Sequence, residues 1–277
     1  MTTTTRPPLI GHHALHNRFH IGGTLTLESP LRLSSGRAND ETDAPVMRGT
    51  DGVPYIPGTS LRGALRAWLE RMLACAPGYR SCTLFERDES SEACLTASRS
   101  KQQKLQEILD DPGKGELDAL GYIEAHLCDV CRLFGSTHFA GKLVVDDARA
   151  VGDANAATRI RDGVGIDRDT GTAAHNIKFD YEVVETESTF PLSLWAENLT
   201  PHEGTLVQLL IHALQQGEIV LGGKRGGGFG RVQLGETVEV QGFTDPEDHL
   251  NKLLLEESGY SPLTLDDLPA TTAGEEG

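Results

Sequence analysis

The sequence predicts an α+β protein with a ferredoxin-like core, because its expected elements follow the order strand, helix, strands, helix, strand. Residues 19–29 carry Ile, Gly, Leu and Leu at every second position, which predicts a half-buried first strand. Residues 60–74 follow a Pro-Gly turn and repeat apolar residues at helical spacing, so we expect a helix with one buried stripe. The clearest helix is expected from Thr200 to Gly217, since Thr200 is followed by a proline and then by a capping glutamate.

The spacing of these elements divides the chain into a core, an insertion and a tail. Residues 1–74 and 136–243 supply the core. Gly, Asp and Thr turn signals between extended pieces predict a long protruding hairpin at about 161–184. Residues 75–135 form a polar insertion that carries the cysteines, and residues 244–277 form an acidic C-terminal tail.

The net charge of −16 argues against a generally basic nucleic-acid-binding protein. The charge is unevenly placed, however, because residues 219–232 hold three basic side chains and no acid. A local basic groove is therefore compatible with the acidic total. No segment reaches the roughly 18 apolar residues of a membrane span, and the first residues lack the layout of a signal peptide. We expect a cytoplasmic protein.

The chain has five cysteines, Cys75, Cys82, Cys94, Cys128 and Cys131, and an odd number in a reducing compartment argues against a disulfide framework. Cys128 and Cys131 have the spacing of one half of a zinc site. Cys82 and Cys94 are the candidates for the other half, which leaves Cys75 as the spare. Four thiolates leave no open position for a substrate, so the zinc would be structural. Free buried cysteines, a redox pair and a chance cluster remain alternatives.

The segment LGGKRGGGFGR at 221–231, called the glycine loop below, is neither a P-loop nor a dinucleotide fingerprint. Lys224 is followed by Arg225 rather than Ser or Thr, and the residues after the loop are strand-like. Glycines still let a backbone approach phosphates closely, and Lys224, Arg225 and Arg231 supply positive charge. We expect phosphate contacts here, with a flexible hairpin tip as the alternative.

Four motifs occur together in order: IPGTSLRGALR at the first helix, CRLFG after the insertion, GVGIDRDTGTA in the hairpin, and the glycine loop. Over about residues 18–235 they resemble the RAMP superfamily, and specifically the repeated backbone subunit (Cas-seven family, Csm/Cmr-type) of type III CRISPR effector complexes. The resemblance implies an RRM-like palm with a thumb hairpin. It also implies three kinds of partner: a guide RNA, a complementary target RNA that many members cleave, and other effector subunits, including copies or paralogues of this chain.

The resemblance implies RNA contacts in three regions. In the family, the region that matches Ser60, Arg62 and Arg66 lies against the guide backbone. A helix N-terminus offers free N–H groups to an anion, and arginines one turn on can reach neighbouring phosphates, although a solvated helix flank is the alternative. The other expected contacts are Gly223, Lys224, Arg225, Gly226, Gly227 and Arg231 in the glycine loop, and Val164, Ile166 and Arg168 in the hairpin. The apolar hairpin residues would press against bases, unless they only pack the hairpin.

The resemblance also implies a catalytic aspartate, because a loop aspartate shortly before a Pro-containing segment is needed for target cleavage in the family. Asp43 in TDAPV matches best, and Asp40 is the runner-up because the loop length could shift the alignment. The carboxylate would hold Mg²⁺ or another divalent metal, or assist proton transfer from the attacking 2′-hydroxyl. Two alternatives are a non-catalytic guide-binding scaffold and a RAMP endoribonuclease that processes precursor guide RNA.

Overall fold

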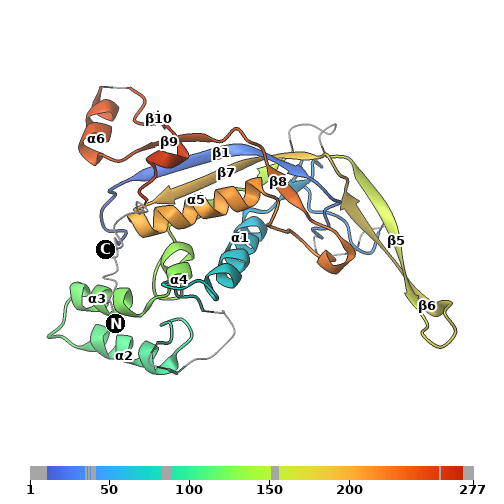
Figure 1. Cartoon of the computed structure of the whole chain (residues 1–277), viewed down its shortest axis with the longest axis horizontal. Helices are drawn as coiled ribbons and strands as arrows, with labels where there is room; N and C mark the ends of the chain where they lie inside the picture. The colour runs from blue at the N-terminus through green and yellow to red at the C-terminus, as the bar shows by residue number, and fades with distance from the viewer. Residues whose placement is uncertain are drawn as a thin grey trace.

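A computed structural model describes most of the chain (Figure 1). The described residues are 11–34, 36, 38, 42–82, 89–90, 92–150, 156–255 and 257–270. In chain order, the elements are β1 (Arg18–Leu27), β2 (Tyr55–Ile56), α1 (Gly58–Leu73), α2 (Arg99–Asp110), α3 (Glu116–His126), α4 (Asp129–Phe134), β3 (Leu143–Val145), β4 (Ala148–Arg149), β5 (Thr158–Ile166), β6 (Ala173–Val184), β7 (Thr189–Glu197), α5 (Pro201–Gln215), η2 (Arg225–Gly227), β8 (Val232–Leu234), β9 (Glu239–Phe243), α6 (Pro246–Leu254), β10 (Ser261–Leu263) and η3 (Leu265–Asp267). Within the described ranges, no helix combines the length and apolar character that a membrane span needs.

The main sheet has the strand order β10-β9-β1-β7-β3, and β8 also pairs with β1. All of these pairings are antiparallel. With α1 and α5 as the helices, strands β1, β3, β7 and β9 follow the β-α-β-β-α-β order of a ferredoxin-like fold. Figure 1 shows α1 and α5 on the same side of the sheet, and this arrangement confirms the predicted α+β class.

The core lies between the sheet and these helices. On β1, Phe19, Ile21 and Leu25 are fully buried and belong to one apolar cluster with Leu65 of α1 and Leu210 of α5. Neighbouring strand residues point to opposite faces, so the alternation in the sequence selects which face of β1 meets the helices.

Helix α5 follows its local sequence signals closely. Thr200 is the N-cap residue, and its hydroxyl oxygen accepts a hydrogen bond from the backbone N–H of Glu203 at 3.4 Å. Glu203 completes the capping box, since its Oε2 accepts from the Thr200 N–H at 2.9 Å. Beyond the end of the helix, Gly217 adopts a φ of 68°, a conformation that favours glycine. The predicted helix is confirmed.

Helix α1 starts earlier than its sequence predicts, at Gly58, with Pro57 as the N-cap. The Gly58 N–H donates to Asp147 Oδ1 at 2.7 Å. A Cβ atom at Gly58 would lie 2.1 Å from the carbonyl oxygen of Val145, so a larger residue would push the helix start away from β3. A carboxylate of this chain therefore lies at the helix N-terminus, the position where an anion is most favoured.

Strands β5 and β6 form the separate hairpin that the sequence predicts, and Figure 1 shows it projecting from the body. Its base is tied down by hydrogen bonds from two segments near the N-terminus. Leu31 and Val184 exchange backbone hydrogen bonds of 2.8 and 2.9 Å, and the Glu182 N–H donates to the carbonyl oxygen of Ala44 at 3.0 Å. The loop that follows the first strand is thereby held against β6.

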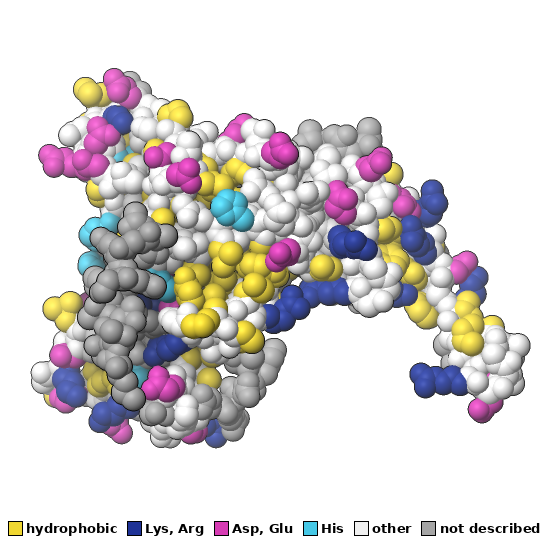
Figure 2. All heavy atoms as spheres, in the orientation of Figure 1, with side chains coloured by type: hydrophobic (Ala, Val, Ile, Leu, Met, Phe, Trp, Pro, Cys, Tyr) yellow, Lys and Arg dark blue, Asp and Glu magenta, His cyan; other side chains and the backbone are white. Residues whose placement is uncertain are grey.

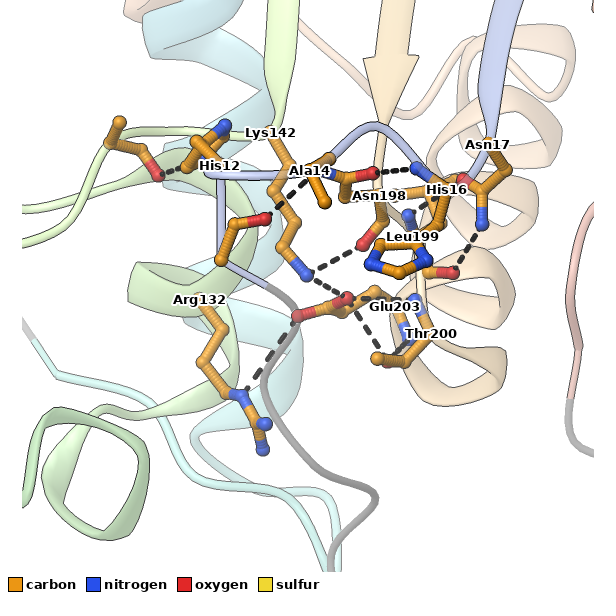
Figure 3. Close-up of polar contacts among 12 residues, drawn as sticks. His12, Ala14, His16, Asn17, Arg132, Lys142, Asn198, Leu199, Thr200 and Glu203 are labelled. Carbon is orange, nitrogen blue, oxygen red and sulfur yellow. Dashed lines mark hydrogen bonds and ion pairs between the residues drawn. The ribbon is translucent and has the colours of Figure 1, made fainter. Parts of the chain in front are cut away.

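A buried ion cluster joins α4, the start of β3 and α5 (Figure 3). Lys142 Nζ lies 2.5 Å from Glu203 Oε2, and it donates to the carbonyl oxygen of Asn198 at 2.8 Å. Arg132 Nε lies 3.9 Å from Glu203 Oε1, and the three charged side chains are each at most 1 % exposed. Burial lowers the pKa of Lys142, while the Glu203 carboxylate opposes this shift.

Glu203→Gln is expected to destabilise the protein by about 3–5 kcal/mol, because Lys142 then remains a buried charge without its carboxylate. The glutamine oxygen can still accept the hydrogen bonds from Thr200, so the substitution mainly tests the charge. Urea unfolding of the full chain measures the loss. Glu218→Gln, at an exposed carboxylate just after α5, is the control, with an expected change below about 0.5 kcal/mol. Similar unfolding free energies for the two variants would contradict this prediction.

Candidate functional site

Four of the five cysteines lie together within the insertion at 75–135, and one of them, Cys131, belongs to α4. The Sγ atoms of Cys82, Cys94, Cys128 and Cys131 all lie within 4.8 Å of one another. Cys82 Sγ is 3.5 Å from Cys128 Sγ and 3.6 Å from Cys131 Sγ. Cys75 is exposed and lies outside this group. The structure thus brings together the same four thiols that the sequence pattern indicated.

The cluster has the dimensions of a tetrahedral thiolate site for a metal ion. With metal–sulfur bonds of about 2.3 Å, the sulfur atoms of a tetrahedron lie about 3.8 Å apart. The observed separations of 3.5 and 3.6 Å fit that distance. Hydrogen bonds among the four thiols lower the pKa of Cys94 and Cys131 but raise the pKa of Cys82 and Cys128, so the geometry of the cluster is what indicates a metal site. The four cysteines could therefore hold a metal such as zinc.

Three hydrogen-bond donors outside the thiol groups point at two of these sulfur atoms. The Cys128 backbone N–H donates to Cys94 Sγ at 3.3 Å. Thr96 Oγ1 and Arg66 Nη2 donate to Cys131 Sγ at 3.3 and 3.4 Å. Such donors orient metal ligands and stabilise their negative charge. No local sequence pattern indicates these contacts, because they join segments far apart in the chain.

The two arginines of α1 hold the end of α4. Arg66 Nη1 donates to the carbonyl oxygen of Gly135 at 3.1 Å, and Arg62 Nη2 donates to the carbonyl oxygen of Phe134. Cations are favoured at a helix C-terminus. Arg66 is 8 % exposed. The pKa of Arg62 is lowered, mainly by burial of its side chain and also by the nearby positive charge of Arg66. Arg66 is therefore buried inside the molecule, whereas we expected it at the surface that contacts RNA. Ser60 is half-buried at the start of α1.

Asp43 lies at the base of the hairpin and is exposed. Its backbone N–H donates to Asp180 Oδ1 at 2.8 Å, and the Asp180 N–H donates to Asp43 Oδ2 at 3.2 Å. This pair of bonds fixes the Asp43 backbone against β6. The N–H of Asp43 and then the side chain of Thr42 lower the pKa of Asp180. Asp40, the runner-up, lies outside the described residues.

The glycine loop meets the hairpin through aromatic rings that the sequence pattern did not single out. Lys224 Nζ lies 3.5 Å from the ring centre of Tyr181 and 4.6 Å from that of Phe179. Phe179 covers Gly163, where an added Cβ would come within 2.4 Å of the ring. Phe179 and Tyr181, two positions apart on β6, are the signal for this contact, because such residues share one face of a strand. Phe229 continues this cluster, with its ring centre 6.2 Å from that of Tyr181.

The other expected RNA contacts lie at the surface. Arg225, Gly226, Gly227 and Arg231 are exposed, and Gly223 and Lys224 are half-buried. In the hairpin, Val164 is 47 % and Ile166 61 % exposed, and Arg168 is exposed in the turn. The two apolar side chains are therefore not buried within this chain. Figure 2 shows Lys and Arg side chains gathered on the concave side between the body and the hairpin.

Comparison with known proteins identifies a family. A search of curated proteins finds no match. The model of the RAMP superfamily matches residues 24–233, which run from within β1 to β8 and include the cysteine cluster, the hairpin and the glycine loop. The match spans most of the chain and agrees with the four motifs in the sequence. This protein belongs to the RAMP superfamily.

Proposed function

We propose that this chain is a guide-RNA-binding backbone subunit of a type III CRISPR effector complex and that it cleaves complementary target RNA. Membership of the RAMP superfamily supports a CRISPR-associated RNA-binding role and assembly with other effector subunits. The observation that carries the finer proposal is the placement of the glycine loop, the hairpin and Asp43. Lys224 of the loop packs on β6, and Asp43 is hydrogen-bonded to the same strand.

In this proposal, the concave basic surface holds the guide through its phosphates. Arg225 and Arg231 are exposed, and the adjoining glycines let a strand of RNA approach the loop backbone. Phosphate contacts suit a guide-binding subunit, which must accept any guide sequence. The exposed Val164 and Ile166, with Arg168 at the turn, would contact bases or a neighbouring subunit's duplex.

Cleavage would take place at the base of the hairpin. The exposed Asp43 carboxylate is suited either to accept a proton from the 2′-hydroxyl of the target or to bind a divalent metal ion. The Asp180 contacts would fix its position. Residues 75–135 would form the inserted structural zinc site on the core of residues 1–74 and 136–243. In this arrangement zinc supports the fold and takes no part in the cleavage step.

A non-catalytic guide-binding scaffold is the second candidate, because one observation favours it. Among the residues that the structure describes, the four cysteines are the only group of three or more potential metal ligands. Asp43 belongs to no such group, so the described part of its surroundings offers a metal ion few protein ligands. The cleavage experiment described in the Discussion separates the two candidates.

Arg225→Gln tests the guide-binding surface. We expect weaker binding to every guide RNA alike, with the slope of log affinity against log salt reduced by about one unit or less. Fluorescence anisotropy of the full chain with two guides of unrelated sequence, at several salt concentrations, measures both quantities. Arg71→Gln, at an exposed arginine in the last turn of α1, is the matched control and should leave affinity unchanged. A loss of affinity for only one of the two guides would mean that Arg225 contacts bases. Equal losses of affinity in both variants would mean that the overall charge of the protein, and not a specific surface, determines binding.

A further inference from the structure

The cysteine cluster has a buried cation beside it. The Arg66 guanidinium uses each of its three nitrogen atoms for a different partner. Nε donates to Glu70 Oε1 at 2.8 Å, Nη1 to the carbonyl oxygen of Gly135 at 3.1 Å, and Nη2 to Cys131 Sγ at 3.4 Å. Because Arg66 is 8 % exposed and fixed at three points, it cannot turn away from the sulfur without breaking the other contacts.

This arrangement has a chemical consequence for a bound metal. Four thiolates around a divalent cation leave two net negative charges, and Cys94, Cys128 and Cys131 are buried. Buried negative charge is costly unless donors or cations compensate it. Glu70 neutralises part of the arginine charge but also holds the guanidinium in place. Cys131 accepts from Thr96 as well as from Arg66, so two of the three donors described above, including the cation, lie at this one sulfur atom.

We propose that Arg66 is a positioning residue of the metal centre, which holds the Cys131 thiolate in place and couples metal binding to the docking of α1 on α4. Through Gly135, the same side chain holds the end of the helix that carries Cys131. Metal binding and helix docking therefore stabilise each other. This inference rests on the proposed structural metal site and is independent of RNA cleavage.

Cobalt substitution of the full chain provides the test, because Co²⁺ reports on its thiolate ligands through charge-transfer absorption. Arg66→Gln is expected to weaken metal binding about 10- to 100-fold in chelator competition, the usual effect of losing an outer-shell partner. It should also move the thiolate-to-cobalt band to longer wavelength, because a sulfur atom without its donor gives up electron density more readily. Arg66→Lys, which keeps a cation, should recover part of both effects.

Arg62→Gln is the matched control, since Arg62 also holds α4 through Phe134 but has no sulfur contact in the described structure. It should leave the cobalt band unchanged. The same band shift in both variants, or no shift in Arg66→Gln, would overturn the proposal. If Arg66→Gln does not fold, Thr96→Val tests the same sulfur and should shift the band in the same direction, and an unchanged band there would also count against it. Failure of the unaltered protein to bind cobalt or zinc would remove the metal centre itself.

Discussion

Asp43→Ala is expected to slow cleavage of a bound target RNA by about 100-fold or more, which is the usual contribution of a group that moves a proton. Guide and target binding should survive, because the change removes no contact to a phosphate. The carboxylate is exposed and accepts from the Asp180 N–H at 3.2 Å, so the cost to folding should be about 1 kcal/mol or less. Single-turnover cleavage by the assembled effector complex, with guide binding measured in parallel, provides the measurement.

Asp43→Asn separates the charge from the shape of this side chain. The asparagine oxygen can still accept from Asp180, so the loop should stay in place while cleavage falls as in the alanine variant. Cleavage that persists in EDTA but is lost on substitution would indicate proton transfer, whereas loss in both would indicate a divalent metal. If the Asp43→Ala variant cuts normally and the Asp40→Ala variant does not, the catalytic residue lies in this loop but is Asp40 and not Asp43. If the unaltered complex never cuts with any divalent metal, the chain is a scaffold.

Cys128→Ser is expected to abolish stoichiometric zinc binding and to destabilise the insertion together with α4. Structural zinc sites contribute roughly 10 kcal/mol or more of apparent binding free energy to folding. Cys128 is 1 % exposed and lies at the N-cap of α4, so its loss affects both the site and the core. Metal analysis by mass spectrometry and thermal unfolding of the purified full chain measure the two effects, and chelation of the unaltered protein should reproduce them.

Cys75→Ser is the matched control, since Cys75 is exposed and outside the cluster. Zinc content and unfolding temperature should match those of the unaltered protein. The prediction fails if the native protein holds less than about half an equivalent of zinc and all five thiols react freely. In that case the four cysteines are metal-free thiols that happen to lie close together.

Features encoded by neighbouring residues were predictable from the sequence. The capping box at Thr200 and Glu203 defines the start of α5 almost alone, because its hydrogen bonds span only three residues. The alternation on β1 likewise selects its buried face. The paired spacing of Cys128 and Cys131 indicated half of a metal site, although only the fold shows that Cys82 and Cys94 lie beside it.

Features that depend on packing between distant segments were not predictable. Arginines four residues apart on a helix look the same whether their neighbour is a phosphate or a protein carbonyl. The docking of α4 gives Arg62 and Arg66 carbonyl partners within this chain, and it joins segments about 70 residues apart. Similarly, the contact of Lys224 with Tyr181 depends on how the glycine loop meets the hairpin. No pattern of neighbouring residues in the sequence indicates that Lys224 lies close to Tyr181.

The buried ion pair between α4 and α5 has a consequence for building chimeric proteins from this scaffold. By residue number, α4 falls within the insertion at 75–135, yet Val130, Leu133 and Phe134 are part of the main apolar cluster, and Arg132 faces Glu203. Replacing the whole segment with that of another protein would therefore remove part of this protein's hydrophobic core. The exchangeable segment should instead lie between Cys82 and Cys128, and its replacement must supply apolar side chains in the places of Leu95, Leu105, Ile108 and Ala119, which belong to the same cluster. Any foreign segment must then bring one thiolate in the place of Cys94, since the host supplies the other three.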